Sequence, residues 1–169
     1  MGTEVAPLKE LLFQRVEQLY SSEEQEMEAF AKILEYIHSH ELKEVFVRMA
    51  DRSKEHISLL GDVLVRLDRK ATHRKVQMTQ GILDEGWLAI KKSRSPEVLD
   101  AMLLSVGQQM KHFEIAGYRA IQSYARALGY QDISDIAKRT LEEEEEEDAE
   151  LTRIARSHIN QSAIEPNIA

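Results

Sequence analysis

The chain has 169 residues, of which 43% are hydrophobic and only 6% aromatic, and its formal net charge at pH 7 is −8. It contains no cysteine, which excludes disulfides, thiolate metal sites and cysteine nucleophiles. The acidic balance argues against nucleic-acid binding, which needs a basic face, and the scarcity of aromatic, proline and glycine residues favours an all-α protein over a sheet protein.

The sequence also limits the location and the chemistry of the protein. No apolar run approaches the ~18 residues of a membrane span, and the N-terminal residues lack the layout of a signal peptide. We therefore expect a cytoplasmic protein with no membrane partner and no nucleic-acid partner. Because neither a Gly-x-Ser-x-Gly motif nor a phosphate-binding loop is present, we assign no catalytic residue.

The first half of the chain predicts two long helices and a weaker helical segment. The first helix should cover residues 7–38, with a proline tolerated in its first turn, and the second should cover residues 41–70. Residues 72–92 read as one or two shorter helices, because Gly81 and Gly86 weaken helical structure there.

The second half predicts two further long helices. Ser95 is a capping residue and Pro96 suits the first helical position, so the third long helix should begin there and end before Gly129, which favours a left-handed cap. The fourth should cover residues 131–158, and residues 159–169 should form a flexible tail.

The lengths of the connections indicate how these helices are arranged. Short connections join the first helix to the second and the third to the fourth, which favours two antiparallel hairpins. The long segment between the second and third helices suits a helical crossover. We therefore predict a single all-α domain, residues 1–158, built as a four-helix bundle with that crossover.

Polar residues interrupt the apolar seam of each predicted long helix. A carboxylate on such a seam faces the interior, and burying its charge costs several kcal/mol unless a metal, a proton or a counter-charge compensates it. We therefore predict a polar layer across the core. The interrupting residues are Glu23 on the first helix, His56 on the second, Glu114 on the third, and Glu144 and Asp148 on the fourth.

Together these five residues are candidate ligands for iron or manganese, which carboxylate and imidazole groups bind in helical bundles. Their spacing departs from the Glu-x-x-His motif that a ferritin-type dimetal bundle carries on two helices. Ser53 stands three residues before His56, and Glu144 and Asp148 are four residues apart. Within the acidic run of residues 142–147, periodicity points only Glu144 inward.

One segment resembles a known family. Residues 108–118, Gln-Gln-Met-Lys-His-Phe-Glu-Ile-Ala-Gly-Tyr, are similar to the Gln-x-x-Glu-His-Tyr-Glu-Ile-Ala-x-Tyr signature of the YciF-type stress proteins, a branch of the ferritin-like superfamily. The resemblance implies a ferritin-like bundle that forms a homodimer, is linked to stress responses and is suspected of binding iron. It extends over about residues 8–156, through residues 20–25, 78–82, 127–130 and 140–148.

At two positions the chain departs from the family pattern. The family's glutamate in a His-Leu-x-Glu-Thr motif falls on Arg52, and the first glutamate of its signature falls on Lys111. We expect these cations to replace metal charge by pairing with Glu23, Glu114 or Glu144. In the alternative, Arg52 and Lys111 extend their charged ends to solvent, and the five candidate ligands bind one or two metals.

Two functions follow from this contrast, and whether the protein is an enzyme stays open between them. The first is a noncatalytic ferritin-like stress-family protein with a degenerate dimetal site and no cofactor, acting as a homodimer or through an unidentified protein partner. The second is an iron- or manganese-binding protein with oxidase or peroxide-consuming activity. Cations within ~5 Å of a metal position oppose metal binding, so the places of Arg52 and Lys111 distinguish the two.

Overall fold

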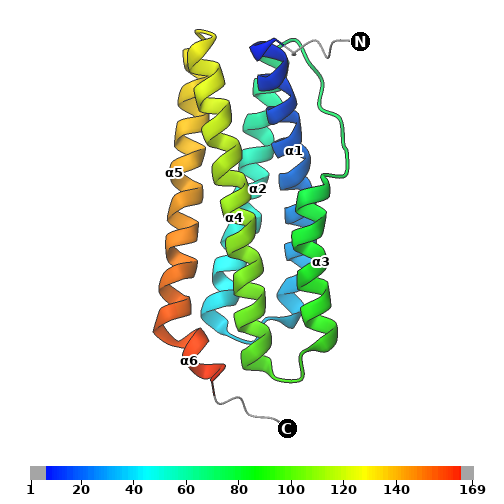
Figure 1. Ribbon diagram of the computed structural model, residues 1–169, viewed down its shortest axis with the longest axis vertical. Helices are drawn as coiled ribbons and strands as arrows, with labels where there is room; N and C mark the ends of the chain where they lie inside the picture. Colours follow the sequence, from blue (N-terminus) through cyan, green and yellow to red (C-terminus); the bar gives the residue numbers. More distant parts are fainter. Residues whose placement is uncertain (1–6, 165–169) are drawn as a thin grey trace, which may run out of the picture.

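The computed structural model describes residues 7–164, and within them every regular element is helical, which confirms the all-α prediction. The described residues form four long helices and a shorter crossover helix, which are arranged as Figure 1 shows. The long helices are α1 (Leu8–Ile33), α2 (His40–Arg66), α4 (Pro96–Ala127) and α5 (Gln131–Ile154), and α3 (Gln77–Lys92) is the crossover helix. Three short elements complete the described chain: the 3₁₀ turn η1 (Leu34–Tyr36), the π-helical turn η2 (Ala155–Ile159) and α6 (Asn160–Ser162).

The connections produce the predicted bundle topology. In Figure 1, α1 descends, α2 ascends beside it, and the chain then returns downward through an extended segment and α3 before α4 ascends and α5 descends. Helices α2 and α4 are therefore parallel, which is the arrangement of a ferritin-like bundle with one long crossover. Helix α3 packs on α4 and α1, so it lies outside the four-helix core.

Local signals begin and end the helices. The Ser95 hydroxyl accepts a hydrogen bond from the backbone N–H of Val98, and Pro96 occupies the first turn of α4, as predicted. Gly129, just after α4, has a φ of +80° and provides the predicted left-handed conformation. Ser39 caps α2 in the same way, by accepting from the N–H of Leu42.

Two helices end earlier than predicted. Helix α1 stops at Ile33 rather than residue 38, because the turn that follows is bound by Asp100 of α4, which accepts the backbone N–H groups of His38 at 2.9 Å and Ser39 at 2.6 Å. Helix α2 stops at Arg66 rather than residue 70, because Asp68 takes a left-handed conformation with a φ of +58°.

The crossover contains one helix, and its first residues are not helical. Residues 72–76 lie along α1 as an extended strap, where the backbone carbonyl of Thr72 accepts the Ser21 hydroxyl at 2.8 Å and the N–H of Val76 donates to Gln25 at 2.6 Å. These contacts explain why α3 begins five residues later than the predicted start at residue 72.

Helical structure also continues past residue 158, where the flexible tail was predicted to begin. The side chain of Ile159 is 3% exposed, and residues 160–162 form α6. This side chain belongs to the hydrophobic cluster at the lower end of the bundle as drawn in Figure 1, and its burial there holds the segment in place. Residues 165–169 of the predicted tail, and residues 1–6 of the predicted domain, lie outside the described residues.

The hydrophobic core is divided into two clusters along the bundle. On α1 the upper cluster reaches Leu19 and the lower one begins at Ala29, while on α4 the lower cluster reaches Met110 and the upper one begins at Ile115. The interval between them is the level at which the polar layer was predicted. The two helices approach closely just above it, since a Cβ on Gly117 would lie 2.7 Å from Cδ2 of Leu19.

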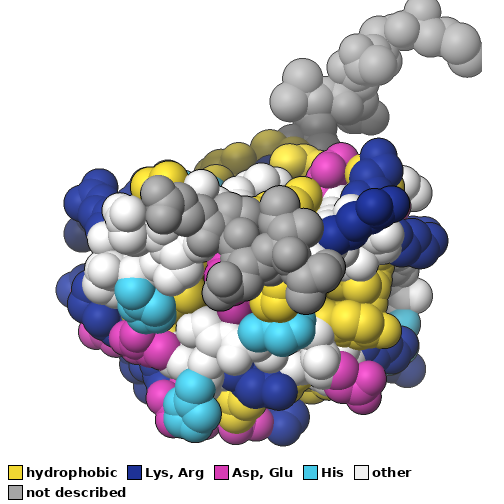
Figure 2. All heavy atoms as spheres, turned by 90° about the horizontal axis from the view of Figure 1, so that it is seen from below, with side chains coloured by type: hydrophobic (Ala, Val, Ile, Leu, Met, Phe, Trp, Pro, Cys, Tyr) yellow, Lys and Arg dark blue, Asp and Glu magenta, His cyan; other side chains and the backbone are white. Residues whose placement is uncertain are grey.

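The exterior is polar and mixed in charge. None of the described helices combines the length and the apolar character that a membrane-spanning helix needs. Figure 2 shows the lower end of the bundle, where basic side chains are dispersed among acidic and histidine side chains.

Candidate functional site

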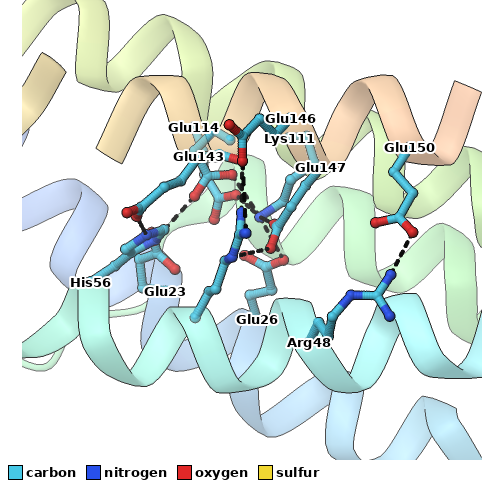
Figure 3. Close-up of polar contacts among 12 residues, drawn as sticks. Glu23, Glu26, Arg48, His56, Lys111, Glu114, Glu143, Glu146, Glu147 and Glu150 are labelled. Carbon is cyan, nitrogen blue, oxygen red and sulfur yellow. Dashed lines mark hydrogen bonds and ion pairs between the residues drawn. The ribbon is translucent and has the colours of Figure 1, made fainter. Parts of the chain in front are cut away.

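A layer of buried charged side chains crosses the core between the two hydrophobic clusters (Figure 3). Each long helix contributes to it, and none of its seven members is more than 4% exposed. The members are Glu23 and Glu26 from α1, His56 from α2, Lys111 and Glu114 from α4, and Glu144 and Glu147 from α5. The predicted polar layer is therefore present in the structure.

Lys111 is the centre of this layer. Its ammonium nitrogen lies 2.7 Å from Glu114 and 2.7 Å from Glu144, and it lies 3.2 Å from Glu147 and 3.3 Å from Glu26. Four carboxylates from three helices thus surround one cation. Burial opposes the charged form, but the attraction of these carboxylates raises the pKa of Lys111 well above its ordinary value, so the ammonium stays charged.

His56 is the second buried cation. Its Nδ1 lies 3.2 Å from Oε1 of Glu23 and 3.0 Å from Oε1 of Glu144, and its Nε2 lies 2.9 Å from Oε2 of Glu143. Burial favours the neutral ring, yet the hydrogen bonds to Glu144 and Glu23 outweigh it and raise the pKa of His56 to about 11. The ring is therefore an imidazolium at neutral pH.

The carboxylates of the layer differ in their preferred protonation. Burial raises the pKa of Glu144, but the charge of Lys111 and the contact with His56 prevail and lower it to about 2. Burial raises the pKa of Glu26 to about 7, although the attraction of Lys111 opposes this. Burial and the charge of Glu26 also raise the pKa of Glu114 well above its ordinary value. Glu144 is therefore a fixed anion, whereas Glu26 and Glu114 are sensitive to their surroundings.

Tyr118 supports Glu23 from α4. Its hydroxyl donates a 2.8 Å hydrogen bond to Oε1 of Glu23, the same oxygen that faces His56. The ring is buried at 1% exposure, and burial together with the charge of Glu23 raises the pKa of the hydroxyl well above its ordinary value. Tyr118 is thus a permanent hydrogen-bond donor that holds one oxygen of Glu23.

Arg52 lies at the edge of the layer rather than inside it. Its side chain is 35% exposed; Nη1 donates to the backbone carbonyl of Glu143 at 3.1 Å, Nε lies 3.5 Å from Glu147, and Nη2 lies 3.8 Å from Glu146. The guanidinium thus extends from α2 to the acidic side of α5. The expected pairing of Arg52 with Glu23, Glu114 or Glu144 is therefore wrong, and its buried partner is Glu147.

The alternative in which both cations extend to solvent is wrong for Lys111. Its side chain is 1% exposed and pairs with Glu114 and Glu144, as the ion-pair interpretation expected. The structure thus separates the two cations, with one enclosed in the layer and the other, Arg52, covering the outer side of Glu147.

Four of the five candidate ligands meet in the layer, but Asp148 does not. Its carboxylate is 21% exposed and lies 3.4 Å from Nε2 of His112 on the bundle surface. The inward position on α5 belongs instead to Glu147, three residues after Glu144. On α1, Glu26, three residues after Glu23, is also buried and was not predicted. A polar residue at the three-residue step of each seam was the available signal for both.

Comparisons with known proteins assign the chain to a family. A family model described as Domain of unknown function (DUF892) matches residues 7–164. This chain belongs to that family. It is 30% identical to Protein YciF of Escherichia coli strain K12 over 145 residues, which cover 85% of this chain and 87% of the relative. The resemblance to YciF-type proteins inferred from residues 108–118 is therefore confirmed.

Solved structures extend the comparison to the fold. The crystal structure of the E. coli stress protein YciF superimposes with a TM-score of 0.86 at 27% identity, covering 92% of this chain and 99% of that one. YcfI from Rhodopseudomonas palustris gives a TM-score of 0.84 at 23% identity, with 90% and 97% of the chains covered. A Xanthomonas campestris protein gives 0.71 at 20% identity, with 93% of each chain covered, and these last two likenesses concern the fold alone.

The residues of this DUF892 chain do not fit the metal pair that a ferritin-like fold implies. A dimetal bundle needs its carboxylates free to bridge and chelate metal ions. Here one oxygen each of Glu26, Glu114 and Glu144 faces the ammonium of Lys111. Either ion of such a metal pair, placed next to that ammonium, would be repelled by its fixed positive charge, and the ammonium would occupy a position where the motif requires ligand atoms.

Proposed function

We propose that this protein is a noncatalytic ferritin-like protein, in which side-chain cations replace the charge of a dimetal centre. The observation that supports this most directly is the enclosure of the Lys111 ammonium by four carboxylates, with its two shortest contacts at 2.7 Å. In a helical bundle of this kind, metal ions hold buried carboxylates together. In this chain a covalently attached cation does so, and it neither exchanges nor changes oxidation state.

Three cations share this role in our proposal. Lys111 neutralises the centre of the layer, His56 binds Glu23 and Glu144 on one side, and Arg52 covers Glu147 at the rim. Because the desolvation of buried charges roughly offsets their attraction, such a network contributes more to the specificity of helix pairing than to stability. The function would then depend on the bundle as a binding partner or scaffold, not on turnover.

Metal content tests the proposal. We would purify the protein without a chelator, load it anaerobically with iron(II), desalt it and measure the metal that stays bound. Wild-type protein should retain no iron, whereas the double variant Arg52→Glu, Lys111→Glu should retain it, because both positions regain the acidic residue of the family pattern. An exposed pair, Lys54→Glu with Arg119→Glu, adds the same charge outside the layer and should leave retention unchanged.

Near-stoichiometric iron in the wild-type protein, lost on Glu114→Ala, would reject the proposal. That result would instead support the second candidate function, an iron- or manganese-dependent oxidase or peroxide-consuming enzyme. A specific observation favours this candidate, since Glu23, His56 and Glu144 each offer a ligand atom within 4.8 Å of the others. The N···O distances of 3.0 and 3.2 Å match neighbouring ligands on one ion, which lie about 3 Å apart when each bond is about 2.1 Å.

The wider biological role is also a proposal. Because its E. coli relative is named a stress protein, we propose a stress-linked role for this chain as well. The homodimer, the unidentified protein partner and the cytoplasmic location remain predictions from the sequence. Sedimentation velocity of the purified full chain at several concentrations would decide between monomer and dimer.

A further inference from the structure

A polar hollow lies on the outside of the bundle, between α1 and the strap of residues 72–76. Its volume is about 360 Å³, and every side chain that lines it is polar. The titratable ones are Glu24 and Glu28 from α1 and His73, Arg74 and Lys75 from the strap. No member of the charged layer lines it, so the hollow is separate from the candidate site.

The two walls of the hollow carry opposite charge. Glu24 and Glu28 are four residues apart, so their carboxylates lie on one face of α1. Arg74 and Lys75 place two positive charges on the facing strap. Because a lone anion is repelled by the first wall and a lone cation by the second, an ion of one sign suits the hollow poorly. A molecule that is positive at one end and negative at the other matches both walls.

One carboxylate and one ammonium group of these walls are left unpaired. The carboxylate of Glu24 lies 2.7 Å from Nδ1 of His73, and Arg74 lies 3.7 Å from a carboxylate of α1 outside the hollow. Among the described residues, Glu28 and Lys75 have neither a hydrogen bond nor an ion pair, although both line the hollow. Each is therefore free to bind the opposite charge of a ligand.

Hydrogen bonds to α1 hold the strap on both sides of the hollow. The backbone carbonyl of Thr72 accepts the Ser21 hydroxyl at 2.8 Å, and the N–H of Val76 donates to the Gln25 side chain at 2.6 Å. The three strap residues that line the hollow lie between these two attachments. The separation of the walls is therefore set by the backbone, and a preformed site of this kind loses little entropy when a ligand binds.

We propose that this hollow binds a small polar zwitterion of the amino-acid class. The ligand's ammonium group donates to Glu28 on α1, and its carboxylate accepts from Lys75 on the strap. Small-molecule sites begin at about 300 Å³, which the hollow exceeds, and its polar lining disfavours a ligand with a large apolar side chain. The site goes beyond the proposed function and does not depend on it.

Glycine, β-alanine and γ-aminobutyrate are the probes, because they carry the same two charged groups at increasing separation. We would titrate each into the ¹⁵N-labelled full-length protein and follow the amide chemical shifts. We expect one of the three to bind at a single saturable site and to shift the amides of residues 24–28 and 73–76 most. Acetate and methylammonium, which carry one group each, should bind at least about tenfold more weakly, because each loses one charge-assisted contact.

Variants locate the two contacts. Glu28→Gln and Lys75→Met should each weaken binding about tenfold, for the same reason. Glu35→Gln and Lys70→Met are the matched controls, because both residues are exposed and lie outside the hollow, and the affinity should not change. The double variant Glu28→Lys, Lys75→Glu exchanges the charges of the walls, so it should bind better than either reversal alone, with the ligand turned end to end.

Three results would overturn the proposal. Equal binding of acetate or methylammonium would reduce the site to a simple ion contact. The absence of saturable shifts with all three amino acids would mean that the hollow holds no zwitterion, and unchanged affinity in both Glu28→Gln and Lys75→Met would place the ligand elsewhere. None of these results alters the retention of iron, so this proposal and the proposed function fail separately.

Discussion

The ammonium of Lys111, on α4, lies 2.7 Å from Oε2 of Glu144, on α5, and both side chains are buried. The other oxygen of Glu144 lies 3.0 Å from Nδ1 of His56, on α2. One carboxylate therefore joins two positive groups from two other helices. In a dimetal bundle a bridging carboxylate joins two metal ions in this manner, and here both positive groups belong to the chain.

Removing the central cation should destabilise the protein strongly. In Lys111→Met, four carboxylates lose their shared partner, so the free energy of unfolding at pH 7 should fall by about 3–5 kcal/mol. Urea unfolding followed by circular dichroism, with EDTA present, measures the loss. Lowering the pH should restore part of it, because protonated carboxyl groups no longer repel one another.

Lys138→Met is the matched control for this variant. Lys138 is exposed on α5 and pairs only at 3.7 Å with Glu142, so its replacement should change stability by less than about 0.5 kcal/mol. If the two methionine variants unfolded at the same urea concentration, the ion pairs of Lys111 would not contribute to the free energy of unfolding.

The stability of the protein without metal should decrease as the pH rises from 4.5 to 6.5. Burial raises the pKa of Glu26 from 4.5 to about 7, so in this range the folded protein binds more protons than the unfolded chain, and stability falls with pH. Glu144, with a pKa near 2, loses its contribution only at lower pH, and His56 loses its contribution only above 6.5.

Glu26→Gln should flatten this pH profile. The difference between wild type and variant should change by up to about 3 kcal/mol across the transition of Glu26. Urea midpoints measured at half-unit steps of pH in EDTA provide the test. Parallel profiles for the two proteins would mean that Glu26 titrates normally and is not buried in solution.

The contact between α1 and α4 should tolerate no side chain at Gly117. Its Cβ would lie 2.7 Å from Leu19, so Gly117→Ala should cost about 1–3 kcal/mol through overpacking, despite the better helix propensity of alanine. Gly81→Ala on α3 is the control, because nothing lies within 4 Å of its Cβ position. That variant should gain up to about 1 kcal/mol, and thermal melts should order the two on opposite sides of the wild type.

The turn between α1 and α2 should depend on Asp100. Asp100→Ala removes the acceptor for the backbone N–H groups of His38 and Ser39, and should lower the free energy of unfolding by about 1.5–3 kcal/mol. Hydrogen exchange at those two amides should accelerate more than at α2 amides. Asp84→Ala, which removes only an exposed bond from Gln80, should leave the exchange at the turn unchanged.

The sequence predicted the bundle because its helices carry strong periodic and capping signals. Ser95, Pro96 and Gly129 behave as their residue types indicate, and the long segment after α2 is the crossover. Helix ends set by tertiary contacts were not predictable. Asp100, which binds the turn between α1 and α2, follows His38 by 62 residues and Ser39 by 61.

The candidate site was predicted only in part, because tertiary packing also decides which residues of a helix face are buried. Four layer residues were predicted from the helical repeat, yet Glu26 and Glu147, each three residues after a predicted residue, were not. Steps of three and of four residues lie on one helix face, and which residue is buried depends on where the neighbouring helix packs. Lys111, three residues before Glu114 on α4, forms ion pairs with both residues that were not predicted, Glu26 and Glu147. The pattern of one helix alone does not reveal such pairs, because the partners lie on other helices.

The division of the core into two hydrophobic clusters bears on how the two hairpins find each other during folding. A slip of one helical turn, about 5.4 Å, would separate Glu26 on α1 from Lys111 on α4, and His56 on α2 from Glu144 on α5. It would also place these charged groups against an apolar cluster. Apolar contacts alone distinguish poorly between such neighbouring alignments, whereas an alignment that leaves a buried charge without its partner costs several kcal/mol of stability. The charged layer therefore fixes the register of the α1–α2 hairpin against the α4–α5 hairpin along the bundle axis.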